Sequence, residues 1–127
     1  MTPENRDALI AMTNSGSVEE IWNMLVTGMS HFGFDRLMYG FTRFRTSHGL
    51  GDPSDFVLLS NHPRAYSEIF VNEGHYHQAP MVRWALENDG ACSWRVLADM
   101  AASGTLTTPE QRVVAFNASM NVVAGYT

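Results

Sequence analysis

Apolar residues recur every three or four positions in the first 33 residues, which predicts two helices. The first opens at Thr2-Pro3-Glu4 and is broken by Asn14-Ser15-Gly16. The second ends at Gly33 and lays one apolar face on the core, formed by Val18, Ile21, Trp22, Leu25, Met29 and Phe32. Ser17 and Glu20 have capping-box spacing, in which each side chain accepts the other residue's free N–H.

Further along the chain the apolar pattern changes to alternation, which indicates strands. Residues 37–44 form a predicted strand, residues 47–53 a loop rich in Gly, Asp and Pro, and residues 56–59 the return strand. Helices are predicted at 63–73 and 80–88, each with proline at its start. A short strand at 91–94 and a helical turn or two from 96 to 100 follow.

The last predicted helix starts in a second capping box, Thr108-Pro109-Glu110-Gln111, and stops at Gly125. Tyr126-Thr127 then begins a strand. Helices alternating with hairpin strands predict an α+β fold, an α-β-α sandwich with a central antiparallel sheet. We expect residues 1–127 to form a single domain.

Composition and charge exclude several classes of protein. The net charge is −5, all eight basic residues are arginines, and they form no cluster, so the chain itself is not expected to bind nucleic acid. The single Cys92 excludes an internal disulfide and fits a reducing cytoplasm. No apolar stretch has the length of a signal core or a membrane span.

The stretch from Ser60 to Trp94 concentrates aromatic and histidine side chains, which combine an apolar body with a polar tip. Several such groups together are typical of a small-molecule pocket. The ordered set that carries this pattern is Tyr39-Gly40, Asn61-His62-Pro63, Tyr66, Phe70, Gly74, Pro80 and Trp94. This set resembles the autoinducer-binding domain of LuxR-type quorum-sensing regulators, from about Ser17 to the end of the chain.

The resemblance implies site residues, and several depart from the family's pattern. His62 stands where the family has a Tyr that bonds the ligand's amide carbonyl, and Tyr66 where it has a Trp that bonds the lactone carbonyl. Ala79 replaces the Asp that accepts the amide N–H of an acyl-homoserine lactone. Phe70 and Trp94 match the aromatic wall. The apolar lining is predicted to come from Met38, Gly40, Thr42, Phe56, Leu58, Tyr76 and Val82.

Two functions are compatible with this pattern. The first is a sensor domain that binds a small apolar-tailed signal other than an ordinary acyl-homoserine lactone; the second is a ligand-independent module that pairs with itself or a full-length regulator. The family's domain continues with further strands and a helix-turn-helix domain, so we expect a domain incomplete at its C-terminus that forms a homodimer. No catalytic, cofactor or metal motif is apparent, and His75 and His77 lack a third ligand.

Overall fold

The computed structural model describes residues 1–127 and divides them into two compact units, Met1–Gly40 with Leu58–His62, and Phe41–Val57 with Pro63–Thr127. The predicted α+β class is confirmed. Six α-helices accompany one two-stranded antiparallel sheet, a set of elements consistent with an α-β-α arrangement. No helix combines the length and apolar character that crossing a membrane requires.

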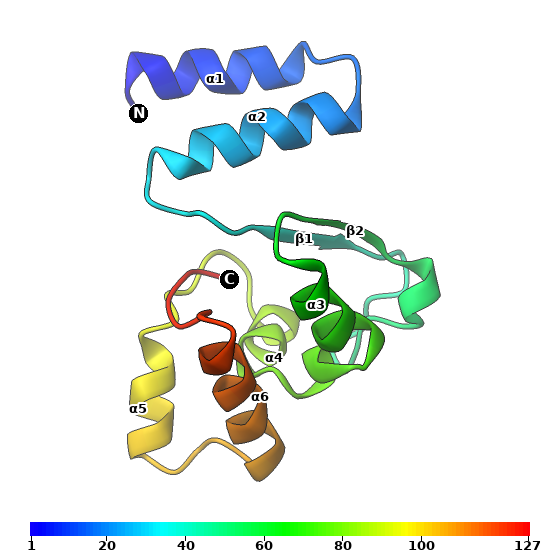
Figure 1. The fold of residues 1–127 in the computed structure, drawn as a ribbon, viewed down its shortest axis with the longest axis vertical. Helices are drawn as coiled ribbons and strands as arrows, with labels where there is room; N and C mark the ends of the chain where they lie inside the picture. Colours follow the sequence, from blue (N-terminus) through cyan, green and yellow to red (C-terminus); the bar gives the residue numbers. More distant parts are fainter. The chain divides into compact units, whose positions relative to one another are not determined.

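The first unit begins with a helical hairpin, α1 (Pro3–Thr13) and α2 (Val18–Ser30) (Figure 1). Ser17 caps α2 as predicted, its hydroxyl accepting the Glu20 N–H at 3.1 Å. The Glu20 carboxylate, however, accepts the N–H of Gly16 at 3.3 Å. The predicted capping box is therefore only half formed, because the Glu20 side chain reaches one residue further back.

The predicted apolar face of α2 is not buried. Val18 and Phe32 are each 62% exposed, and α2 contains no buried residue. Helix α1 packs on α2, but its own Leu9 and Ile10 remain about half exposed, so α1 covers little of that face. Trp22, Leu25 and Met29 on the same face are half-buried, so the predicted face is only partly covered within the first unit.

The sheet consists of β1 (Met38–Phe41) and β2 (Val57–Ser60). Asn61 holds the end of the sheet that lies in the first unit. The Asn61 side chain accepts the Leu37 N–H at 2.6 Å and donates to the Asp35 carbonyl at 3.0 Å. Strand β1 is shorter than predicted because the Thr42 hydroxyl accepts the Phe44 N–H at 3.1 Å. This local bond competes with strand pairing and starts the loop early.

The second unit contains all the buried residues. Its elements are η1 (Pro53–Asp55), α3 (Arg64–Ser67), η2 (Glu68–Asn72), η3 (His75–Gln78), α4 (Pro80–Glu87), α5 (Val96–Ala102) and α6 (Thr108–Ser119). The predicted helix at 63–73 thus starts as α3 and widens into the π-helical η2. The buried residues are Tyr66, Val71, Tyr76, Ala79, Pro80, Met81, Leu106, Glu110 and Val113.

The start of α6 differs from the prediction by one residue. Thr107, not Thr108, is the cap: its hydroxyl accepts the Glu110 N–H at 3.2 Å, and Glu110 accepts the Thr107 N–H at 3.0 Å. The reciprocal bonds require a spacing of three, which Thr107 and Glu110 have.

The end of α6 was also predicted too late. The helix ends at Ser119, and Asn121 adopts a left-handed φ of 63°. The N–H groups of Asn121 and Val122 then bond the carbonyls of Ala118 and Asn117, at 3.1 and 2.8 Å. This is a Schellman motif with asparagine in the place that glycine usually takes, so Gly125 is not the stop.

The predicted strand at 91–94 pairs with the last residues of the chain. Cys92 and Thr127 exchange both backbone hydrogen bonds, at 2.7 and 3.0 Å, on one side of the Ser93–Tyr126 bridge, and the Trp94 N–H donates to the Gly125 carbonyl at 2.9 Å on the other. The predicted extended conformation of both segments is therefore confirmed, as an isolated antiparallel bridge.

Candidate functional site

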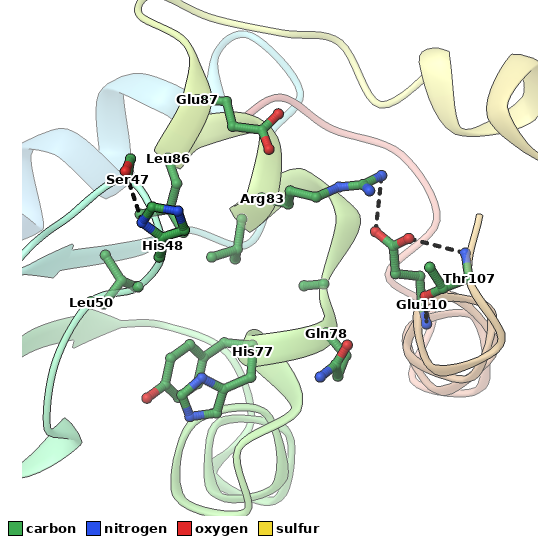
Figure 2. Close-up of a pocket in the computed structure, with 14 residues that line it drawn as sticks. Ser47, His48, Leu50, His77, Gln78, Arg83, Leu86, Glu87, Thr107 and Glu110 are labelled. Atoms are coloured by element: carbon green, nitrogen blue, oxygen red, sulfur yellow. Dashed lines mark hydrogen bonds and ion pairs between the residues drawn. The ribbon is translucent and has the colours of Figure 1, made fainter. Parts of the chain in front are cut away.

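A cavity of about 320 Å³ lies within the second unit and is called the pocket below (Figure 2). Its walls come from three parts of that unit. They are the turn at 47–50, the stretch 76–79 with the side chains of Val82, Arg83, Leu86 and Glu87 on α4, and Thr107 with Glu110 at the start of α6. Its volume lies at the lower end of those of small-molecule sites.

The turn at 47–50 is fixed by bonds on both sides. Thr46 donates its N–H to the Gly49 carbonyl at 2.9 Å, and the Thr42 hydroxyl donates to the Leu50 carbonyl at 3.0 Å. Arg45 donates to the carbonyls of Ala85 and Leu86 at 2.7 and 3.3 Å. Those carbonyls belong to the last turn of α4 and have no intrahelical partner, so Arg45 both caps α4 and holds the turn beside it.

Helix α4 contributes one face to the pocket. Val82, Arg83, Leu86 and Glu87 recur at spacings of three and four, which places them together on a helix. Ala79 precedes the helix in the cap position, makes no side-chain hydrogen bond and is 6% exposed. The pocket wall at Ala79 is therefore a methyl group.

An ion pair joins α4 to the start of α6 in the pocket wall. Arg83 and Glu110 lie 3.1 Å apart, with the Glu110 side chain 5% exposed and that of Arg83 44% exposed. Figure 2 shows Arg83 extended toward Glu110 and away from His48. Because Glu110 also accepts the Thr107 N–H, both of its carboxylate oxygens are occupied. Sequence reasoning identified Glu110 only as a helix cap and gave no signal for Arg83.

Three further titratable side chains line the pocket and were not predicted as site residues. The His48 ring lies 3.0 Å from the Ser47 hydroxyl, and the His77 ring packs on Tyr76 with centroids 4.1 Å apart. Glu87 is exposed and forms no ion pair. The pocket thus combines an apolar side with several polar groups.

Among the predicted site residues, Tyr76, Ala79 and Val82 line the pocket. Two others support it from outside the lining: the Phe56 ring packs edge-on against Tyr76 at 5.6 Å, and Thr42 holds Leu50. The structure therefore brings these five predicted residues into one neighbourhood.

Tyr76 has an unusual environment for a tyrosine. It is 4% exposed, and its buried hydroxyl makes no hydrogen bond. Burial raises its pKa, and the charge of Asp52 raises it further. The Asp52 carboxylate accepts the N–H and the hydroxyl of Ser54, bonds that lower its own pKa. An unsatisfied buried hydroxyl beside a cavity is a candidate ligand contact.

Tyr66, Phe70 and Trp94 lie apart from the pocket lining. The Tyr66 ring stacks on those of Phe70 and Phe116, at 5.4 and 5.6 Å. Its hydroxyl donates to the Asn117 side-chain oxygen at 2.9 Å. The Trp94 indole N–H donates to the Thr127 hydroxyl at 2.7 Å. The polar ends of Tyr66 and Trp94 are therefore satisfied within the protein.

The remaining predicted residues, Met38, Gly40, Leu58 and His62, belong to the first unit. All are half-buried except Gly40, which is exposed, and a side chain added at Gly40 would meet no atom within 4 Å. Burial lowers the pKa of His62, as does the charge of Arg36, while Asp35 acts in the opposite direction.

The arrangement does not suit a metal ion. No three His, Cys, Asp or Glu side chains come together to hold one. His75 packs on Phe116 with ring centroids 4.9 Å apart, whereas His77 packs on Tyr76. The two alternate histidines thus contact different neighbours.

Comparison with known proteins identifies the family. A search of curated protein sequences and a search of solved structures returned no match. The sequence pattern of the family described as the autoinducer binding domain matches residues 17–127, which is most of the chain and includes the whole pocket. The chain therefore belongs to the autoinducer binding domain family of LuxR-type regulators.

Proposed function

We propose that the domain senses a small apolar-tailed signal for a LuxR-type regulator and binds it in the pocket. One observation carries the proposal: Ala79, which stands where the resemblance places a ligand-binding Asp, lines a 320 Å³ cavity together with Val82 and Tyr76. Sensing requires binding and no bond-making chemistry. The family membership supports a cytoplasmic regulator in which another domain contacts the DNA.

The ligand differs from an ordinary acyl-homoserine lactone. A carboxylate that accepts an amide N–H contributes about 1.5–3 kcal/mol, and a methyl group cannot replace it. An amide buried against Ala79 would lose that bond. We expect affinity for acyl-homoserine lactones to be at least about tenfold below that of a pocket with the carboxylate.

A thermal-shift panel tests this function. Acyl-homoserine lactones of several chain lengths are compared with alcohols and amines of matched length, on wild type and on Val82→Phe, which fills the pocket. Val123→Phe, at a 67% exposed valine, is the control. Binding that Val82→Phe abolishes and Val123→Phe retains supports the proposal. Tight lactone binding would instead show that another group accepts the amide N–H.

The second candidate is a ligand-independent dimerisation module. Apolar side chains at the surface of the first unit favour it, including Val18, Ile21 and Phe32, which are 62%, 40% and 62% exposed. Light scattering during size-exclusion chromatography measures the oligomeric state, and native mass spectrometry of protein from a bacterial host detects a retained small molecule. A ligand-free dimer favours the module, whereas a co-purified molecule favours the sensor.

A further inference from the structure

One carboxylate of the pocket lining has no ion-pair partner. The charged lining residues of the pocket are Arg83, Glu87 and Glu110, and the positive charge of Arg83 is already matched by Glu110 at 3.1 Å. Glu87 forms no ion pair. The guanidinium of Arg45, which donates to the carbonyls of Ala85 and Leu86, lies at the same end of α4 but forms no ion pair with Glu87. A carboxylate without a partner at the wall of a cavity favours a cation over an anion in contact with it.

The arrangement around Glu87 also provides room for an apolar tail. Leu50, Val82 and Leu86 line the same cavity, and Glu87 lies on α4 next to Leu86. In Figure 2 Leu50 and Leu86 lie on the side of the pocket that holds His48, whereas Arg83 is directed to the other side by Glu110. Because Glu87 follows Leu86 directly and lines the same cavity, a molecule with its tail on the leucines can present its head to Glu87, while Arg83 keeps its partner Glu110.

We propose that the signal bound in the pocket carries a protonated amine, which pairs with the Glu87 carboxylate. The inference rests on the proposed function and adds the chemical class of the ligand's head. Glu87 is the last residue of α4 and supplies an acidic acceptor about two helical turns beyond Ala79, which precedes that helix. Such a ligand needs no acceptor at Ala79, which accounts for a methyl group at that wall.

The test compares three probes of equal chain length, hexylamine, hexanol and hexanoate, by calorimetric titration at mildly alkaline pH. Alkylamines, like the lysine amine, stay protonated until about pH 10, whereas histidines are neutral there. Wild type is expected to bind hexylamine roughly fivefold more tightly than hexanol, the upper range for a solvent-accessible ion pair. Hexanoate is expected to bind more weakly than hexanol, and added salt should reduce the preference.

Two variants test whether Glu87 causes the preference for the amine. Glu87→Gln should remove the amine preference, so that hexylamine and hexanol bind with about equal affinity. Asp89→Asn, an equal change of charge at an exposed residue outside the pocket lining, should retain the preference. Equal melting temperatures show that both variants are folded, as expected for exposed side chains.

The outcomes distinguish the inference from the proposed function. Equal binding of hexylamine and hexanol, both blocked by Val82→Phe, overturns the amine inference and leaves the pocket as the ligand site. An amine preference that survives Glu87→Gln also overturns it. Binding insensitive to Val82→Phe, or no binding of any probe, overturns the amine inference and contradicts the proposed function as well.

Discussion

The guanidinium of Arg83 on α4 lies 3.1 Å from the carboxylate of Glu110 on α6, and the two partners differ in exposure. Glu110 is almost fully buried, while the Arg83 side chain is 44% exposed. Removing Arg83 therefore leaves a buried negative charge without its partner, whereas removing the Glu110 charge leaves an arginine that water can solvate. We expect Arg83→Met to lower the free energy of unfolding by about 2–3 kcal/mol and Glu110→Gln by about 1 kcal/mol.

Urea denaturation measures both changes, with Arg95→Met as the control because Arg95 is exposed and forms no ion pair. Equal losses of unfolding free energy for Arg83→Met and Glu110→Gln would contradict the unequal burial of the two side chains.

The identity of the threonine that caps α6 can be tested with two variants. Thr107 caps α6 through its hydroxyl, whereas Thr108 is the first helical residue and makes no capping bond. Thr107→Ala should cost about 1 kcal/mol of stability, and Thr108→Ala close to nothing. The urea midpoints of the two variants show which threonine is the cap. A larger loss for Thr108→Ala than for Thr107→Ala would favour Thr108, the cap predicted from the sequence.

Tyr66 tests whether the aromatic stack is core or ligand contact. Its hydroxyl donates to Asn117, so Tyr66→Phe should lower stability by about 1 kcal/mol. Because Tyr66 does not line the pocket, the affinity for hexylamine or hexanol should stay unchanged. An affinity loss with an unchanged melting temperature would assign Tyr66 to the ligand site instead.

His62 predicts a pH dependence of stability. Burial and the charge of Arg36 lower its pKa in the folded protein below the ordinary value of 6.5, so the folded chain binds fewer protons than the unfolded chain. This contribution to stability is full above pH 6.5 and is lost as the pH falls toward the lower folded pKa. His62→Gln should therefore flatten the loss of unfolding free energy on acidification.

The matched control for that series is His31→Gln, at an exposed residue at the end of α2. Parallel curves for wild type and His62→Gln, measured by denaturation across mildly acidic pH, would show that His62 does not contribute.

The sequence predicted those features of the fold that depend on neighbouring residues. Prolines at the starts of α1 and α4 and the apolar spacing of α2 placed these helices correctly, because such signals act within a few residues. The predicted helix boundaries were wrong where two local signals compete. Two adjacent threonines could each cap α6, and Asn121 ended the helix before Gly125.

The pocket was predicted only in part, for a different physical reason. Ala79, Tyr76 and Val82 lie close together in the sequence, so one stretch could carry the signal. Arg83 and Glu110 meet only because α4 and α6 both pack against η3, and the hairpin turn with His48 is placed by Arg45. Such contacts depend on tertiary packing and leave no periodic pattern in the chain.

The most direct test of the central claim, that the pocket binds a small molecule, is a nuclear magnetic resonance titration of the isotope-labelled domain with hexylamine and then hexanol. We predict concentration-dependent shifts for residues of the pocket lining, led by Leu50, Tyr76, Val82 and Leu86. Shifts confined to Tyr66, Asn117 and Trp94, or to α1 and α2, or no shifts at all, would contradict the claim.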